Sequence, residues 1–124
     1  MPWPPTIGAS LPRAAAAFGV EKKLSAYCLN VDHELGAAKA RGFQEILDIR
    51  SADVDFLAGE LLAGVLEAPI ASVRDNAPYG VLCEVRIAVR GLRDHHHRVV
   101  EVTTSWELRD EGSAPRLVTA YIDG

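Results

Sequence analysis

The feature that most constrains the fold of this chain is a change in hydrophobic period at Pro69. Before this residue, apolar side chains recur three and four positions apart, which is the spacing of helices that bury one face. After it, apolar and polar residues alternate, which is the pattern of strands with one buried face. Proline has no backbone N–H and commonly ends a helix, so it marks the boundary between the two halves.

Three helices are predicted before this boundary. The first covers residues 20–30 and the second runs from about Gly36 to Asp48. The third follows Ser51, whose hydroxyl is suited to cap a helix, and it ends before Pro69.

Four strands are predicted after Pro69, at residues 70–74, 81–90, 98–108 and 116–122. Short turn-rich segments join them, so neighbouring strands should be antiparallel. The fold class is therefore α+β, with about three N-terminal helices packed on one face of an antiparallel sheet of about four strands and the other face partly open. The predicted core contains Leu24, Phe43, Leu47, Leu57, Leu61, Val85, Ile87, Val102 and Trp106.

The chain is expected to form one domain. Three prolines among the first five residues predict an extended N-terminal arm over residues 1–11, followed by a single α+β domain over residues 12–124. No apolar run reaches the roughly 18 to 20 residues that cross a bilayer, and the N-terminus does not resemble a secretion signal. We therefore expect a cytoplasmic protein with no membrane partner, in which Cys28 and Cys83 are buried free thiols.

Charge and motif content restrict the function. The net charge of −4 makes general nucleic-acid binding less expected, because such binding usually needs a basic stripe. The histidines of "DHHH", at residues 94–97, are predicted to lie in a solvated hairpin tip, since adjacent strand residues point to opposite faces. No phosphate-loop, dinucleotide or metalloprotease motif is found, and we expect neither a cofactor nor a metal.

One candidate half-site lies in "LNVDHELGAAKARGF", residues 29–43. Histidine is a residue type that can take or give a proton in catalysis, and His33 precedes a helix whose free amides favour an anion and whose first turns contain Lys39. Together these residues could hold a phosphate and act on it. The alternative is that His33 caps a turn and Lys39 is solvated.

The other candidate half-site is the C-terminal "PRLVTAYI". It offers Arg116, Thr119 and Tyr121. Strict alternation places Arg116 on one face of the strand, and Thr119 and Tyr121 on the other together with Leu117. Thr104 lies among apolar neighbours of its own strand, where the alternative is a hydroxyl bonded to backbone.

These stretches resemble an uncharacterised bacterial domain family. The similarity rests on "KLSAYCLNVDHELGAAKARGF", then "YG", "TSWEL" and the terminal "PRLVTAYI", and it covers the chain from about Pro12 to Ile122. That family in turn resembles the superfamily of small toxin ribonucleases that includes barnase, EndoU, the colicin nucleases and RelE. Many bacterial toxins of that superfamily end in "TAYP", where this chain has Ile122 in place of proline.

The second resemblance implies metal-independent cleavage of RNA, with RNA and a cognate immunity or antitoxin protein as partners. A base takes the proton of the 2′-hydroxyl, whose oxygen attacks the phosphorus, and an acid protonates the leaving 5′-oxygen. By this resemblance, His33 would be the general base or acid, and Lys39 and Arg116 would stabilise the charge of the transition state. Thr119 or Thr104 would bind the phosphate, and Tyr121 would stack on a nucleobase. Arg41 would be a further cation, although it lies on a different side of the helix from Lys39.

The alternative function is a non-catalytic binding or adaptor module, including a homodimer formed through the open sheet face. The acidic charge favours this alternative, and the presence of two half-sites favours the nuclease. The two are separated by geometry, because a phosphodiester site requires both half-sites to meet in one cleft.

Overall fold

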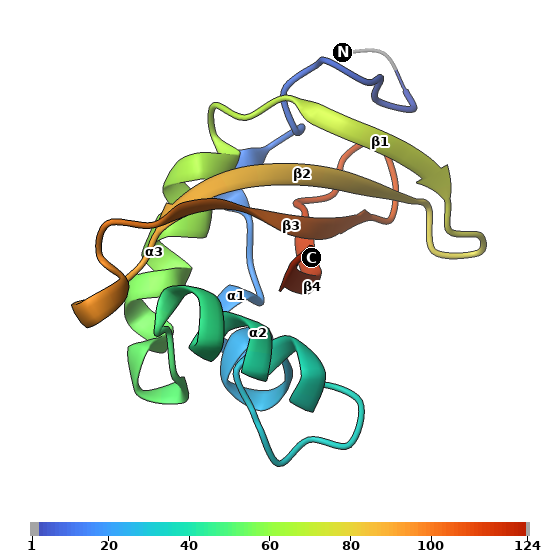
Figure 1. Cartoon of the computed structure of the whole chain (residues 1–124). Helices are drawn as coiled ribbons and strands as arrows, with labels where there is room; N and C mark the ends of the chain where they lie inside the picture. The colour runs from blue at the N-terminus through green and yellow to red at the C-terminus, as the bar shows by residue number, and fades with distance from the viewer. Residues whose placement is uncertain (1–2, 124) are drawn as a thin grey trace.

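The computed structural model describes residues 3–123 and places the three α-helices before the sheet (Figure 1). Helix α1 is short and continues directly into a π-helical segment, and a 3₁₀ turn precedes α3. The three predicted helices are therefore confirmed. Their bounds are α1 Val20–Lys23, η2 Leu24–Cys28, α2 Ala37–Leu47, η3 Ser51–Asp53 and α3 Val54–Val65.

The start of the third helix differs from the prediction. Ser51 is the first residue of the 3₁₀ turn η3 rather than a cap, and α3 begins at Val54. The carboxylate of Asp53 instead accepts the backbone N–H of Arg50 at 2.9 Å. No helix among the described residues is long and apolar enough to cross a membrane.

The four strands form one antiparallel sheet in the order β1-β2-β3-β4. Each strand therefore pairs with its neighbours in sequence, as the short connections predicted. This arrangement confirms the α+β class. The strands are β1 Ile70–Asp75, β2 Val81–Arg90, β3 Val99–Leu108 and β4 Arg116–Ile122.

The core lies between the sheet and the helices. Helix α3 packs on β2, while α1, η2 and α2 pack against β4. The approach of α3 to β2 is so close that a Cβ atom on Gly64 would lie 2.3 Å from Cγ2 of Ile87. All nine residues of the predicted core are buried.

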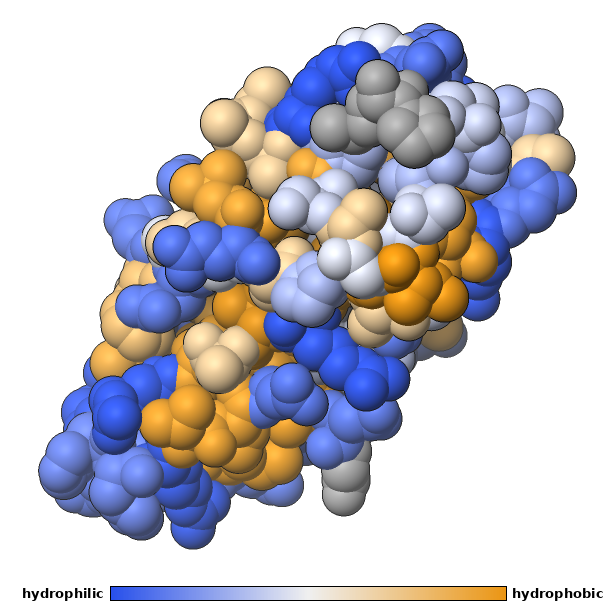
Figure 2. Space-filling model, turned by 90° about the horizontal axis from the view of Figure 1, so that it is seen from above, coloured by the Kyte–Doolittle hydropathy of each residue, from blue (hydrophilic) through white to orange (hydrophobic). Residues whose placement is uncertain are grey.

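The outer face of the sheet is only partly open. Arg86, Ala88 and Arg90 of β2 are exposed there, whereas Thr103 and Glu107 of β3 are buried. From above, hydrophobic and hydrophilic residues are interspersed over the surface (Figure 2).

The N-terminal segment pairs with one end of each edge strand of the sheet. The Gly8 N–H donates to the carbonyl of Ile70, and the Ile70 N–H donates to the carbonyl of Ala9, both at 2.8 Å. Further along the chain, Phe18 pairs with the outer edge of β4. At these two points the backbone of the edge strand is already paired and is not available to another strand. The C-terminal end of the predicted arm thus lies against the start of β1, and Leu11 belongs to the core.

The histidine tract is less solvated than predicted. Between β2 and β3 lies a 3₁₀ turn, η4 Arg93–His95, and Nδ1 of His95 lies 2.9 Å from the carbonyl oxygen of Ile46 at the end of α2. His95 therefore anchors the hairpin, while His96 and His97 are exposed. Among the described residues, no group of three or more histidine, cysteine or acidic side chains is placed to hold a metal.

Candidate functional site

A bulge in β4 decides which of its side chains lie together. Thr119 pairs with Ser105, and Leu117 pairs with the next residue of β3, Trp106, so Val118 is an extra residue. A bulge reverses the alternation of the side chains that follow it. Leu117 consequently points into the core, and Thr119 does not share its face.

This bulge corrects the predicted faces of the last strand. Arg116 pairs with Glu107, Thr119 with Ser105 and Tyr121 with Thr103. Because their partners alternate along β3, these three side chains of β4 share one face. Strict alternation had separated Arg116 from Thr119 and Tyr121.

Lys39 joins the two half-sites. Its Nζ donates to the hydroxyl of Thr119 at 3.0 Å and to the hydroxyl of Tyr27 at 3.1 Å. The ammonium also lies 4.8 Å from the ring centroid of Tyr27 and 5.6 Å from that of Tyr121. Within residues 3–123, no ion pair with a carboxylate forms at Lys39. The start of α2 and the end of β4 therefore converge on one ammonium group, which is held rather than solvated.

Tyr27 is the residue that sequence reasoning missed. It lies in the π-helical segment η2, and such segments often occur at functional sites. A Cβ atom on Gly36 would lie 2.3 Å from the carbonyl oxygen of Tyr27, so glycine allows the start of α2 to approach it. The sequence showed Tyr27 only as part of a helical apolar face, because no local pattern reveals a contact with Lys39.

His33 acts on the turn before α2. Its Nδ1 accepts the backbone N–H groups of Leu35 and Gly36, both at 3.0 Å. A neutral imidazole that accepts at Nδ1 carries its hydrogen on Nε2. The ring also lies edge-on to Tyr27, with centroids 4.7 Å apart. In this orientation His33 caps the turn and offers a donor at Nε2, but it offers no free lone pair for a general base.

A hollow of about 530 Å³ lies beside Tyr27. Three cations reach it, and no aspartate or glutamate is among its lining residues. Arg116 is held there by an ion pair with Glu107 at 3.4 Å, and the Lys23 ammonium lies 5.6 Å from the Tyr27 ring centroid. Lys39 and Thr119 are not among the residues that line the hollow, although Lys39 bonds the Tyr27 hydroxyl. We call this the cationic hollow, defined by Phe18, Lys22, Lys23, Tyr27, His33 and Arg116.

The structure does not bring Thr104 or Arg41 to this hollow. Thr104 is 0% exposed, and its hydroxyl donates to the carbonyl of Val85 at 2.6 Å and accepts from Nε1 of Trp106 at 2.8 Å. Thr104 therefore has the alternative role expected from the sequence, a hydroxyl bonded to the backbone. Arg41 is exposed and lines a different hollow at the end of α2.

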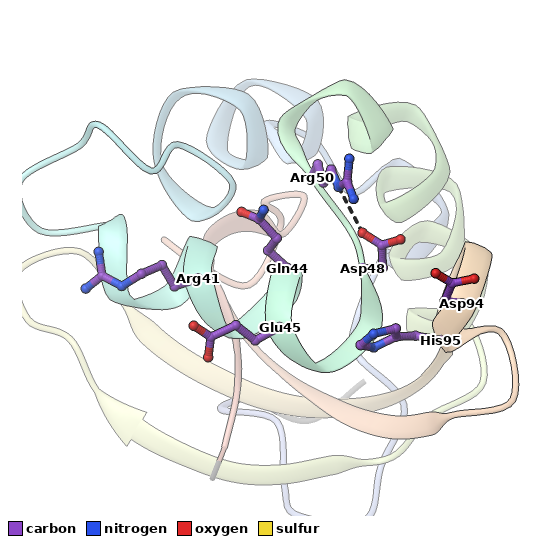
Figure 3. A pocket seen from close by; sticks show the side chains of 7 residues that line it. All are labelled: Arg41, Gln44, Glu45, Asp48, Arg50, Asp94 and His95. Atoms are coloured by element: carbon purple, nitrogen blue, oxygen red, sulfur yellow. Dashed lines mark hydrogen bonds and ion pairs between the residues drawn. The ribbon is translucent and has the colours of Figure 1, made fainter.

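The hollow that Arg41 lines adjoins a closed network of ion pairs. Figure 3 shows Arg50 beside Asp48, and Asp48 also binds Arg93 at 2.9 Å. Arg93 also pairs with Asp53. Desolvation acts to raise the pKa of Asp48, but the bonds from Arg93 and Arg50 outweigh it and hold this pKa below the usual value. The charges are satisfied within the network, which ties the α2–α3 connection to the β2–β3 hairpin.

Neither cysteine is a candidate nucleophile. Both thiols are free and buried, as predicted. Burial raises the pKa of Cys28, although Lys39 and Thr119 act in the opposite direction, and burial raises the pKa of Cys83 to about 11. The thiolate is the reactive form, so both groups are unreactive at neutral pH.

Comparison with protein families matches residues 10–124 to a model described as "Domain of unknown function (DUF6883)". Neither the curated proteins nor the solved structures gave a match. The expected resemblance to an uncharacterised domain family is confirmed. The more distant relationship to ribonuclease toxins stays a prediction.

Proposed function

For this chain, which belongs to the DUF6883 family, we propose that the cationic hollow binds RNA through a backbone phosphate. The observation that carries the proposal is the placement of Lys39. Its partly buried ammonium is held by two hydroxyls, without an ion pair among residues 3–123. A charge withdrawn from water without a counter-charge is costly, so a bound anion would supply what the fold leaves out.

Tyr27 carries the effect of Lys39 into the hollow. Its hydroxyl oxygen accepts a hydrogen from Lys39, which leaves the hydroxyl hydrogen free to donate. Hydrogen bonds in a chain polarise one another, and the ammonium strengthens the Tyr27 hydroxyl as a donor to an anion. Tyr27 is one of the residues that line the hollow. On this proposal its free hydroxyl hydrogen donates to the phosphate, while the hydroxyl oxygen stays bonded to Lys39.

The other groups of the hollow suit a phosphate equally well. Lys22, Lys23 and Arg116 supply positive charge, and Nε2 of His33 supplies a neutral donor. Charge-assisted contacts of this kind are the usual means of holding phosphate. The local charge contrasts with the net charge of −4 of the whole chain. Binding should thus be confined to this hollow, and the choice of RNA follows the resemblance to ribonucleases.

Metal-independent RNA cleavage is the second candidate function, and the convergence of the two half-sites favours it. The 2′-oxygen would attack the phosphorus, a base would take the 2′-proton, and the leaving 5′-oxygen would receive a proton, giving a 2′,3′-cyclic phosphate. In this candidate reaction the Tyr27 hydroxyl would donate the second proton. His33 would have to release the amides of Leu35 and Gly36 before Nδ1 could act as the base, which is why binding is proposed first.

The test compares Lys39→Met with Arg41→Met, which removes a cation from an exposed position of the same helix. Lys39→Met should weaken binding of a labelled RNA by about 10- to 100-fold, the effect of losing one charged hydrogen-bond system. Arg41→Met should leave binding unchanged. Fluorescence anisotropy at about 50 and about 200 mM salt measures both, and affinity should fall as salt rises.

His33→Asn is the matched variant for the histidine. The asparagine side-chain oxygen can still accept the amides of the turn, but the Nε2 donor is lost. Binding should fall while the melting temperature stays close to that of the wild type. A wild-type protein that binds no RNA, or a Lys39→Met variant that binds as tightly as Arg41→Met, contradicts the proposal. Release of a product with a 2′,3′-cyclic phosphate would establish the second candidate.

A further inference from the structure

Phe18 is an exposed aromatic residue at the rim of the cationic hollow. Half of its surface, 50%, is accessible to solvent. The hollow that it borders is of about 530 Å³, within the roughly 300–1,000 Å³ of common ligand sites. A half-exposed aromatic ring beside a charged hollow offers an apolar contact surface to a ligand that binds there.

The backbone holds Phe18 firmly in this place. Its N–H donates to the carbonyl of Pro115 at 3.0 Å, and its carbonyl accepts the N–H of Leu117 at 3.1 Å. The next residue, Gly19, has a φ of 74°, and a Cβ atom there would lie 3.3 Å from Cγ of Arg116. These contacts fix the backbone of Phe18 beside that of Arg116, and a fixed backbone lowers the entropic cost of binding.

A second hollow, of about 420 Å³, lies on the other side of Phe18. The two hollows share Phe18, Gly19 and Lys22. The second is lined mainly by apolar side chains, including Val20 and Leu62, and it contains one carboxylate, Glu21. The cationic hollow has three cations and no carboxylate, whereas the second hollow has Lys22 and Glu21 among mainly apolar residues, so a phosphate suits the first hollow better.

We propose that Phe18 is a stacking platform for an unpaired base next to the bound phosphate, so that the ligand of this domain is single-stranded RNA. This inference rests on the proposed function. An aromatic ring stacks on a base only when the base is free of its duplex neighbours, which makes this contact selective for single strands. Lys23 and Arg116 lie on the phosphate side only, Lys22 borders both hollows, and the hollow on the base side is the more apolar of the two.

The experiment compares a short fluorescein-labelled RNA without self-complementarity with the same strand in a duplex. The wild type should bind the single strand more tightly. Phe18→Ala should weaken single-strand binding by about 5- to 150-fold, the usual effect of removing one stacking contact, and should leave duplex binding unchanged. Phe18→Trp should retain single-strand binding, because tryptophan also stacks.

Tyr79→Ala is the matched control, since Tyr79 is similarly exposed, at 53%, but lies beside Arg109 rather than at the hollow. It should bind both RNAs as the wild type does. If the wild type binds both RNAs and Phe18→Ala binds the single strand equally well, the stacking inference is wrong while the proposed function stands. If the wild type binds neither RNA, the proposed function fails and the inference fails with it.

Discussion

At the scale of single residues, the hydroxyl of Thr104 shows how a polar atom in the core can resemble a site residue. It links the carbonyl of Val85 with Nε1 of Trp106 and satisfies both buried groups. From the sequence, a hydroxyl among apolar neighbours fits either a phosphate ligand or a backbone partner. Only the three-dimensional neighbours of Thr104 distinguish them, because Trp106 supplies the second bond.

Thr104→Val should therefore reduce stability without affecting RNA binding. The variant leaves the indole N–H of Trp106 buried without an acceptor, which typically costs about 1 to 3 kcal/mol. Urea unfolding followed by tryptophan fluorescence measures the change. Thr103→Val, at the next position of β3, is the control and should cost less. If Thr104→Val loses RNA affinity at full stability, the hydroxyl belongs to the binding site after all.

Two of the candidate residues named from the sequence line the cationic hollow, and three others form a group in which Lys39 contacts Thr119 and Tyr121. His33, Lys39, Arg116, Thr119 and Tyr121 were named from the sequence because titratable and cationic groups flank a helix start and occupy the last strand. Their grouping depends on one extra residue in β4, and a bulge leaves no reliable mark in a sequence. The capping role of His33 was foreseen as an alternative, but its hydrogen-bonded Nδ1 required coordinates.

At the scale of elements, helices and strands were predictable because burial of one face imposes a period of 3.6 or 2. The strand pairing followed, since short connections favour antiparallel neighbours. The π-helical segment Leu24–Cys28 was not predictable, because its apolar spacing also suits an α-helix. The pairing of the N-terminal segment with one end of each edge strand was also missed, since backbone pairing of irregular chain has no period.

Because α3 packs closely on β2, substituting alanine at two glycines of α3 should change the stability of the domain in opposite directions. A Cβ atom on Gly64 would clash with Ile87, whereas a Cβ atom on Gly59 would meet nothing within 4 Å. Gly64→Ala should destabilise the domain by about 1 to 3 kcal/mol through overpacking. Gly59→Ala should stabilise it by roughly 0.5 to 1 kcal/mol, because alanine favours the helix. Urea unfolding measures both, and equal effects of the two substitutions would contradict this packing.

At the scale of the whole molecule, two groups of ion pairs join segments that are distant in sequence. Asp48, Asp53 and Arg93 link the α2–α3 connection to the β2–β3 hairpin. Glu107 links β3 to β4 through Arg116. The hydrophobic core determines the fold, whereas these pairs fix how its outer segments meet, including the cation that lines the proposed RNA site.

Stability should consequently fall in acid. The hydrogen bond from Arg93 lowers the pKa of Asp53 below its ordinary value of 3.8. At Asp48 and Glu107, desolvation acts to raise the pKa, but the bonds from their arginine partners outweigh it. The pKa of each therefore lies below its ordinary value, which is 3.8 for Asp48 and 4.5 for Glu107. Since the unfolded chain takes up these protons first, the stabilisation is complete above the ordinary values and is lost as pH falls through the lowered ones.

Melting temperatures at a series of pH values measure this loss. Little change should come from these carboxylates between about pH 7 and pH 5.5, and a steep fall should begin below about pH 4.5. Asp53→Asn should melt at a lower temperature than the wild type at pH 7, because the charged bond from Arg93 is weakened. It should also show a shallower fall in acid, since one of the titrating groups is absent. Asp55→Asn, which changes an exposed carboxylate in the first turn of α3, is the control and should follow the wild-type acid profile closely. A wild-type melting temperature that stays level or rises between pH 4.5 and pH 3 would show that the ion pairs do not hold these segments together.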